Sequence, residues 1–218
     1  HCLSSAASDV YKRQPFMHSG QLSIAGVECL ALRISFSGDL GWEIYCDAEY
    51  QEIIYKTLIK ASIIENGGPV GSRALMSLRI EKGYGSWSRE YSPEVWPHES
   101  GLEKLCKLDK DFLNKRALVE NLKNEPRERL VLIKLDEQDC KKSNADATGG
   151  EPIFYSGKGI GRITSGAYGY NVGMSLALGY VKDVSAGDTV DVMVLGEPHK
   201  GKILKAPPFD PEGKILRS

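Results

Sequence analysis

Hydrophobic and polar residues alternate along residues 31–45, ALRISFSGDLGWEIY. Leu32, Ile34 and Phe36 occupy every second position, which is the period of a half-buried strand. The Ser-Gly-Asp sequence at 37–39 is typical of a turn, because glycine accepts backbone angles that other residues avoid. The stretch therefore predicts a hairpin of two short strands joined at this turn.

Apolar residues then recur at helical spacing in three segments. The first predicted helix covers residues 48–66 and begins after Asp47, a residue type that often caps helices. The second covers residues 73–82, and Gly83 is suited to end it. The third covers residues 109–123. Helices therefore dominate the part of the chain that follows the hairpin.

The pattern changes after the Asn-Glu-Pro sequence at 124–126, where short apolar runs separated by glycine-containing turns take over. Strands are predicted at residues 130–135, 152–155, 159–165, 176–181, 189–195 and 202–206. The polar segment 140–150 predicts a loop. Short strands at this spacing favour a small β-barrel or sandwich. We therefore expect the α+β class: a mixed domain over residues 15–125 and an all-β, barrel-like domain over residues 126–218.

Residues 1–14, HCLSSAASDVYKRQ, show no clear period and little apolar content. We interpret them as a disordered or non-native leader and leave them out of the fold.

Composition narrows the classes of function. Of 218 residues, 28 are Lys or Arg and 29 are Asp or Glu, so the net charge of −1 argues against a nucleic-acid or anionic-membrane surface. No apolar run approaches the length of a membrane span. Five widely spaced cysteines without a C-x-x-C pair predict free thiols in a reducing compartment. The four histidines form no metal-spaced pair, so we expect no metal site.

Glu43 stands between Trp42 and Tyr45 in the second predicted strand of the hairpin. Burying an unpaired charge is unfavourable, so a carboxylate among aromatic residues needs either water or a partner. Glu43 therefore either faces solvent or holds a polar ligand rich in N–H groups. Period and composition leave both open.

Other candidate groups have ordinary interpretations as well. Arg73 and Arg79 lie on one predicted helix, where each is either a solvated charge or the partner of a carboxylate such as Glu43 or Glu81. The glycine-rich segment 157–166, GKGIGRITSG, lacks the Walker spacing and a following helix. Strand and turn glycines are therefore favoured over a phosphate loop.

Several motifs, in order along the chain, resemble one family. They are SGDLGWEIY, GSRALMSLRIEKGYGSW, LCKLDKDFLNKRAL, GRITSGAYGYNVGMSLALGYV and the closing APPFDPEGKILR. Together they resemble the folate-binding region of the aminomethyltransferase superfamily, which includes the glycine cleavage T-protein. They are most similar to its dimethylglycine and sarcosine dehydrogenase branch, over residues 22–217.

The resemblance implies a tetrahydrofolate site. It places Glu43 on the pterin, with Tyr45 beside it, and Phe36 where relatives often carry Tyr. Arg73 matches an arginine near the folate, and Lys104 aligns more weakly with another folate-proximal position. A pterin offers neighbouring N–H groups that a carboxylate can accept as a pair. The loop WPHESGL departs from the family's P-L-E-A-G-L but keeps its glutamate.

The resemblance also implies a function: tetrahydrofolate accepts the one-carbon unit released by oxidative demethylation of an N-methyl amine. The sequence contains neither the FAD-binding fingerprint nor the segment with the family's catalytic aspartate. We therefore expect a C-terminal fragment without catalytic residues, with FAD only in the full-length parent. The alternatives are a glycine cleavage aminomethyltransferase and a non-catalytic regulatory subunit of the same superfamily.

The expected partners are folate and an N-methyl amine, with no nucleic acid and no membrane. The expected location is the mitochondrial matrix in a eukaryote and otherwise the cytoplasm.

Overall fold

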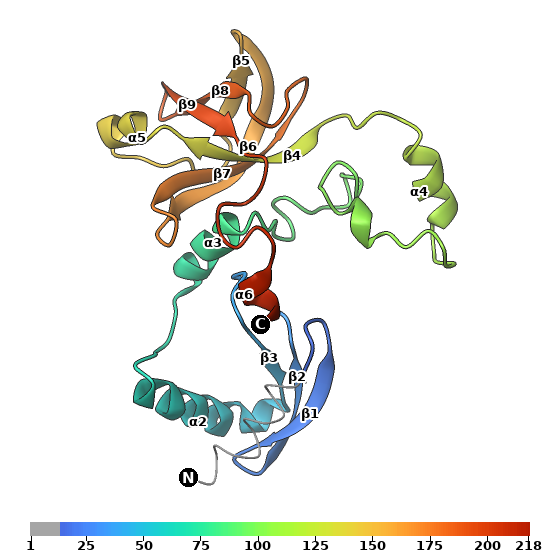
Figure 1. The fold of residues 1–218 in the computed structure, drawn as a ribbon, viewed down its shortest axis with the longest axis vertical. Helices are drawn as coiled ribbons and strands as arrows, with labels where there is room; N and C mark the ends of the chain where they lie inside the picture. The colour runs from blue at the N-terminus through green and yellow to red at the C-terminus, as the bar shows by residue number, and fades with distance from the viewer. Residues whose placement is uncertain (1–13) are drawn as a thin grey trace. The chain divides into compact units, whose positions relative to one another are not determined.

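The computed structural model describes residues 14–218 (Figure 1). The leader predicted at residues 1–14 therefore lies, except for Gln14, outside the described residues. The described chain forms two compact units, one of residues 14–75 with 212–218 and one of residues 76–211. The domain boundary predicted between residues 125 and 126 stays a prediction.

A three-stranded antiparallel sheet of order β1-β2-β3 is the centre of the first unit. Its strands are β1 (Ser19–Ile24), β2 (Val27–Leu32) and β3 (Glu43–Tyr45). The helices are a 3-10 turn (Ala48–Tyr50), α2 (Gln51–Ile64) and α6 (Lys214–Arg217), and α3 (Ser72–Glu81) begins in this unit.

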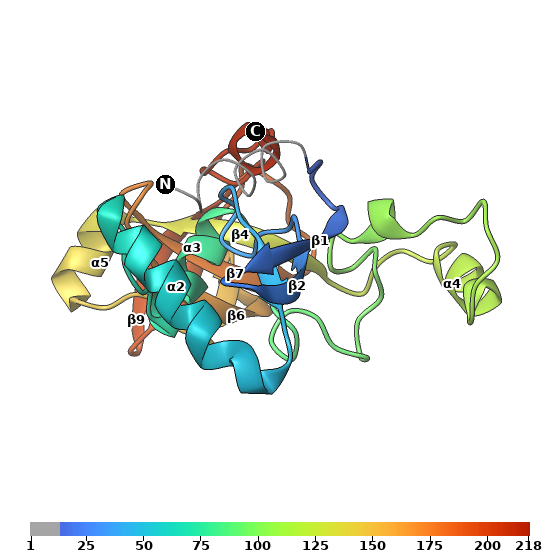
Figure 2. The same cartoon turned by 90° about the horizontal axis from the view of Figure 1, so that it is seen from below.

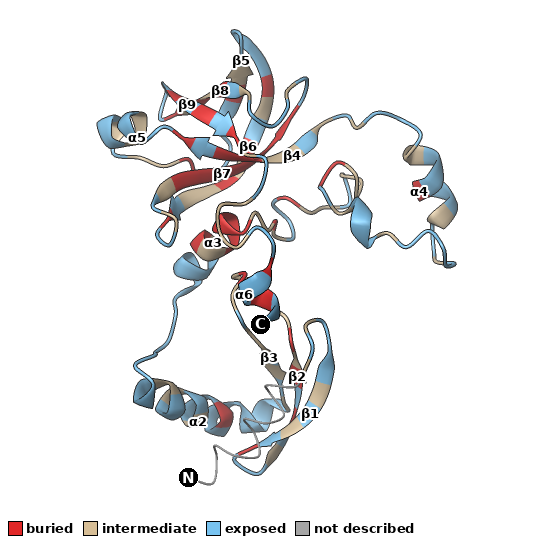
Figure 3. Ribbon diagram, in the orientation of Figure 1, coloured by how far each residue is buried: buried red, intermediate tan, exposed pale blue. Residues whose placement is uncertain are grey.

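Burial alternates along the strands of this sheet, which Figure 3 colours residue by residue. Because successive side chains point to opposite faces, one face collects Ile24 and Cys29, which pack against Ile54 of α2. The other face carries Leu30 and Tyr45, which are 43% and 52% exposed. The first unit therefore has one covered face and one open face.

The hairpin prediction was correct in the turn but wrong in the extent of its first strand. β2 ends at Leu32, and the segment that leads to β3 contains bends around Gly38, whose φ is +89°. The alternation that places side chains on the covered face continues to Arg33, which is only 2% exposed. Ile34 and Phe36, which were predicted on that strand, are instead half-buried loop residues.

The first two predicted helices are confirmed and the third is wrong in part. The 3-10 turn with α2 matches the prediction for 48–66, α3 matches 73–82, and Gly83 ends α3 with a φ of +70°. The predicted helix 109–123 is reduced to α4 (Lys115–Asn121). Asn114 has a left-handed backbone with a φ of 65°, which a right-handed helix cannot accommodate.

The second unit contains a closed antiparallel barrel of strand order β4-β7-β6-β5-β8-β9. The strands are β4 (Arg129–Leu135), β5 (Pro152–Tyr155), β6 (Lys158–Gly169), β7 (Met174–Val181), β8 (Thr189–Val194) and β9 (Glu197–Ile203). Alternate apolar side chains such as Ile133, Ile163 and Val192 fill its core. The predicted α+β class with a barrel-like second part is confirmed.

Two local predictions for the barrel were wrong. The last strand runs from Glu197 to Ile203 instead of over 202–206, because it pairs with β8 directly after the turn at Leu195 and Gly196. The predicted loop 140–150 begins inside α5 (Glu137–Ser143), which packs on β7 and β9 (Figure 2).

Asp136 begins α5 by accepting hydrogen bonds from the backbone nitrogens of Gln138 and Asp139. The glycines of 157–166 lie in the turn and strand after β5, which confirms their structural interpretation.

Candidate functional site

Glu43 and Tyr45 lie side by side on the open face of the first unit's sheet. In the register of β2 and β3, Glu43 pairs with Leu32 and Tyr45 pairs with Leu30. The Tyr45 hydroxyl donates a hydrogen bond of 2.7 Å to Glu43 Oε2. This bond raises the pKa of Tyr45, because ionising the phenol would lose it and place two negative charges together. Tyr45 therefore stays a donor that orients the carboxylate.

The carboxylate of Glu43 keeps free acceptor capacity. A carboxylate offers about four lone-pair sites, and the bond from Tyr45 occupies one of them. Oε1 makes no hydrogen bond to another residue of the described chain. The side chain is exposed, and Leu30 supplies apolar surface beside the phenol. These acceptor sites, with the apolar surface beside them, fit a flat ring that carries paired N–H groups, such as a pterin.

The other predicted folate-binding residues are placed separately. Phe36 is half-buried in the loop before β3, and Arg73 is exposed in the first turn of α3. Neither makes a hydrogen bond or ion pair with Glu43 among residues 14–218. Lys104 is exposed in a short 3-10 helix (Glu103–Leu105) of the second unit. Their assignment to folate stays a prediction.

A buried polar network centred on Glu90 was missed by sequence reasoning. Arg79 Nη1 lies 3.0 Å from Glu90 Oε2, and both side chains are 0% exposed. The same carboxylate accepts hydrogen bonds from the Ser86 backbone nitrogen at 2.8 Å, from Thr164 Oγ1 at 2.6 Å and from Ser165 Oγ. Of the two interpretations of Arg79, the solvated charge is wrong and the pairing with a carboxylate is confirmed, although the partner is Glu90 and not Glu43 or Glu81.

The environment of Glu90 explains how a charge is kept in this core. Burial opposes its ionisation, but hydrogen bonds from Ser165 and Thr164 outweigh it and hold the pKa of Glu90 below its usual range. Tyr180 adds a hydrogen bond of 2.7 Å to the Glu90 carbonyl oxygen. Because Thr164 and Ser165 lie on β6 and Tyr180 on β7, the network fixes the loop after α3 to the barrel.

Two further carboxylates of the second unit also have structural partners. Glu99 accepts bonds of 2.8 Å from Arg127 Nε and Nη2 and one of 2.9 Å from the Trp96 backbone nitrogen. The bonds from Arg127 lower the pKa of Glu99 to about 2. Glu81 is buried and accepts from the Asn171 backbone nitrogen at 3.0 Å. Neither resembles the accessible carboxylate of Glu43.

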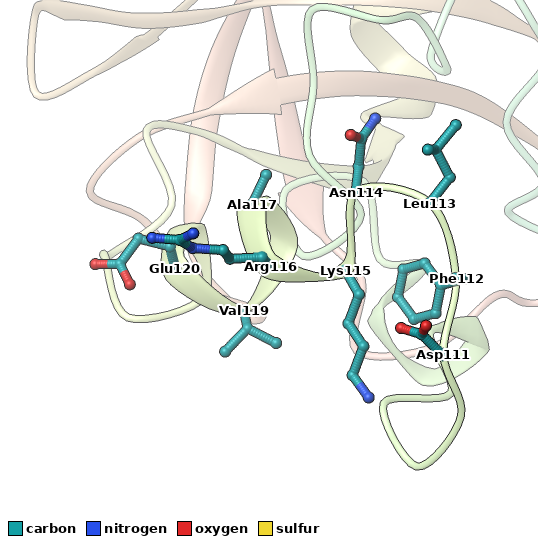
Figure 4. Close-up of a pocket in the computed structure, with 9 residues that line it drawn as sticks. All are labelled: Asp111, Phe112, Leu113, Asn114, Lys115, Arg116, Ala117, Val119 and Glu120. Atoms are coloured by element: carbon teal, nitrogen blue, oxygen red, sulfur yellow. The ribbon is translucent and has the colours of Figure 1, made fainter.

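A hollow of about 1190 Å³ in the second unit is lined by residues of α4 and of the segment before it. Figure 4 shows its side chains pointing in different directions, with Leu113 directed away from Arg116 and Glu120. Ligand sites need polar groups that converge, which this surface does not provide. Within residues 14–218, no group of three His, Cys, Asp or Glu side chains could hold a metal ion.

A second hollow, of about 570 Å³, lies between the segment after α3 and the barrel. Its buried Lys82 is 2.9 Å from Asp210 Oδ2, which neutralises the charge. None of the five predicted folate-binding residues lines either hollow.

Two models of known protein families match this chain, one in each part of its sequence. The GCVT N-terminal domain matches residues 2–110, and the glycine cleavage T-protein C-terminal barrel domain matches residues 128–210. The second match coincides with the closed barrel of the structure, whose first strand begins at Arg129.

Dehydrogenases and aminomethyltransferases are among the relatives that match this chain. Mitochondrial dimethylglycine dehydrogenase of Mus musculus is 34% identical over 205 residues, which are 92% of this chain and 23% of that protein. Mitochondrial sarcosine dehydrogenase of Mus musculus is 30% identical over 214 residues, 93% of this chain and 23% of that protein. An aminomethyltransferase of Desulfitobacterium hafniense is 32% identical over 185 residues, 83% of this chain and 49% of that protein.

A solved structure supports the same fold. The glycine cleavage system aminomethyltransferase T of Bartonella henselae superposes with a TM-score of 0.80 at 21% identity, over 92% of this chain and 54% of that one. The chain thus spans about a quarter of the dehydrogenases and about half of the aminomethyltransferases that it matches. With two family models in order along its length, the chain belongs to the glycine cleavage T-protein family, as its motifs predicted.

Proposed function

We propose that this chain is the tetrahydrofolate-binding region of a flavin-dependent dimethylglycine or sarcosine dehydrogenase. The observation that carries the proposal is the exposed Glu43 carboxylate, held by the Tyr45 hydroxyl on an open sheet face. The similarity to dimethylglycine and sarcosine dehydrogenases over more than nine-tenths of the chain supports the choice of branch.

Each residue has a defined task in this proposal. Glu43 accepts two N–H groups of the pterin, Tyr45 keeps the carboxylate in place, and Leu30 offers surface to the ring. Phe36 and Arg73 are proposed to add contacts from the loop and from α3. Bound tetrahydrofolate supplies the nitrogen atoms that accept the one-carbon unit.

In the full-length protein, we expect FAD and the N-methyl amine to bind outside the residues described. We also propose that Lys104 contacts the folate. In a eukaryote we expect the mitochondrial matrix, because the dehydrogenase relatives are mitochondrial according to their names. None of the helices in residues 14–218 has the length and apolar content to cross a membrane.

A glycine cleavage aminomethyltransferase is the second candidate. It is favoured by the 32% identity to an aminomethyltransferase of which the chain covers about half. Both candidates use the same folate contacts and differ in the need for flavin. Flavin absorbance that copurifies with the full-length protein would separate them.

The test is a calorimetric titration of this chain with tetrahydrofolate under anaerobic conditions, and then with p-aminobenzoylglutamate, which lacks the pterin. We expect one saturable site for tetrahydrofolate and an affinity at least roughly a hundredfold lower for the second compound, equivalent to about 2.8 kcal/mol. Equal affinities, or no heat of binding with tetrahydrofolate, would contradict a pterin-gripping carboxylate.

A further inference from the structure

Arg33 connects two segments of the first unit that are far apart in sequence. Its side chain is 2% exposed. Nη1 donates to the Leu216 carbonyl oxygen at 3.2 Å, and Nη2 donates to the Ser218 carbonyl oxygen at 2.6 Å. The forked guanidinium is thus held by the backbone at the end of α6, a geometry for which arginine is suited.

The same guanidinium lies over the ring of Trp42. Its Cζ atom is 4.6 Å from the ring centroid, within the range of a cation–π interaction. Such contacts are stronger when they are shielded from water, as they are beside a buried arginine. Trp42 directly precedes Glu43, so a fixed Trp42 ring constrains the beginning of β3.

The sheet register places the contact between Arg33 and Trp42 where the loop between β2 and β3 begins and ends. Leu32, the residue before Arg33, pairs with Glu43, the residue after Trp42. The stacked Arg33 and Trp42 side chains therefore lie at the base of the loop formed by residues 34–41. A change in this stacking would be transmitted first to Glu43, because that residue is the first to pair with β2.

The loop itself has little freedom to absorb such a change. The Gly38 backbone nitrogen donates to Ser35 Oγ at 3.1 Å. A Cβ atom placed on Gly41 would come within 3.1 Å of the Ile34 carbonyl oxygen, which shows how closely the two sides of the loop approach. Movement at its base therefore displaces β3.

We propose that Arg33 is a positioning residue for Glu43, linking the C-terminal segment 212–218 to the carboxylate through Trp42. The inference rests on the proposed folate-binding role of Glu43. On this inference, the C-terminal segment contributes to ligand binding indirectly, because it holds the side chain of Arg33. A purely structural Arg33 would change the stability of the unit and leave the affinity of the folded protein for folate unchanged.

The first test replaces Arg33 by Met, which keeps an unbranched side chain and removes the guanidinium. Folate affinity is measured at a temperature at which circular dichroism shows the variant folded. We expect a loss of roughly tenfold. Arg33→Lys keeps a cation over Trp42 without the two-armed fork, so its loss should be intermediate. Arg116→Met, on α4, is the matched control and should bind as the wild type does.

The second test asks whether Arg33 acts through Glu43. In a Glu43→Gln background, Arg33→Met should cause no further loss of affinity, because the group that it positions has already lost its function. Two independent, additive losses would overturn the inference.

The outcomes also separate this inference from the proposed function. A wild type that does not bind folate, or a Glu43→Gln variant that binds equally well, contradicts the proposed function and the inference that rests on it. A weak Glu43→Gln variant beside an Arg33→Met variant of wild-type affinity overturns the positioning role alone. If Arg33→Met does not fold, a folded Arg33→Lys variant with undiminished affinity likewise overturns the positioning role, and an intermediate loss supports it.

Discussion

The open sheet of the first unit and the loop packed against the barrel of the second unit hold their carboxylates in opposite ways. Glu43 is exposed on β3 and accepts a hydrogen bond from Tyr45, and within residues 14–218 its other oxygen has no partner. Glu90 is 0% exposed, with its oxygens bonded to Arg79, Thr164 and Ser165. The first carboxylate is available to a ligand, and the second has its acceptor sites directed at the protein itself.

The comparison of Glu43 with Glu90 indicates that one carboxylate is available for ligand binding and the other serves the stability of the fold. Breaking a buried ion pair leaves an uncompensated charge in the core, which is strongly destabilising. An exposed carboxylate can be changed at little cost to the fold, because water solvates whatever remains. Substitutions of the two glutamates should therefore affect different measurements.

The largest expected effect is that of Glu90→Gln, which leaves the Arg79 guanidinium buried without its counter-charge. We expect the free energy of unfolding to fall by about 3–5 kcal/mol, measured by urea denaturation. Glu94→Gln, at an exposed position four residues away, is the control and should change it by less than about 0.5 kcal/mol. A loss below about 1 kcal/mol for Glu90→Gln would show that the network contributes little to stability.

A smaller effect, dependent on pH, is expected at Glu99. Its pKa is lowered from 4.5 to about 2, chiefly by Arg127, so its contribution to stability is present above pH 4.5 and is lost as the pH falls towards 2. At neutral pH, Glu99→Gln should destabilise the protein by about 1.5–3 kcal/mol. Unfolding curves recorded between pH 2 and pH 6 should show a weaker pH dependence for this variant. The same slope in wild type and variant would show that other groups cause the acid sensitivity.

The sequence predicted elements where local pattern and tertiary packing agree. The hairpin turn at Gly38, the helices of residues 48–66 and 73–82, and most barrel strands follow from period and turn residues. The hydrogen bond between Tyr45 and Glu43 is consistent with their spacing, because residues two apart on a strand share a face.

The features that the sequence did not predict are buried charges whose partners lie far away in the chain. Thr164 and Ser165 meet Glu90 across more than seventy positions, so no local pattern marks that glutamate as buried. Arg33 has the position of a polar residue in an alternating strand, yet the C-terminal segment covers it. A buried charge is recognised only when the groups that pair with it are known.

The smallest effect on stability is expected at Leu113. The helix predicted over 109–123 included this residue, but it precedes α4 and is 91% exposed. Leu113→Ser should therefore change the free energy of unfolding by no more than about 0.5 kcal/mol. Leu118→Ala removes a buried side chain from α4 and should cost about 2–5 kcal/mol by comparison. Equal losses would mean that Leu113 packs against a surface of the protein in solution.

The most direct test of the role of Glu43 measures two quantities on one preparation of Glu43→Gln. They are the affinity for tetrahydrofolate and the free energy of unfolding. Glutamine keeps the shape but presents a donor to one pterin N–H, so affinity should fall by at least roughly tenfold, or about 1.4 kcal/mol. Stability should change by less than about 0.5 kcal/mol, because the side chain is exposed. Glu28→Gln, on the same sheet face, should leave both values unchanged. Wild-type affinity in Glu43→Gln, with the fold intact, would contradict the assignment of Glu43 to the folate.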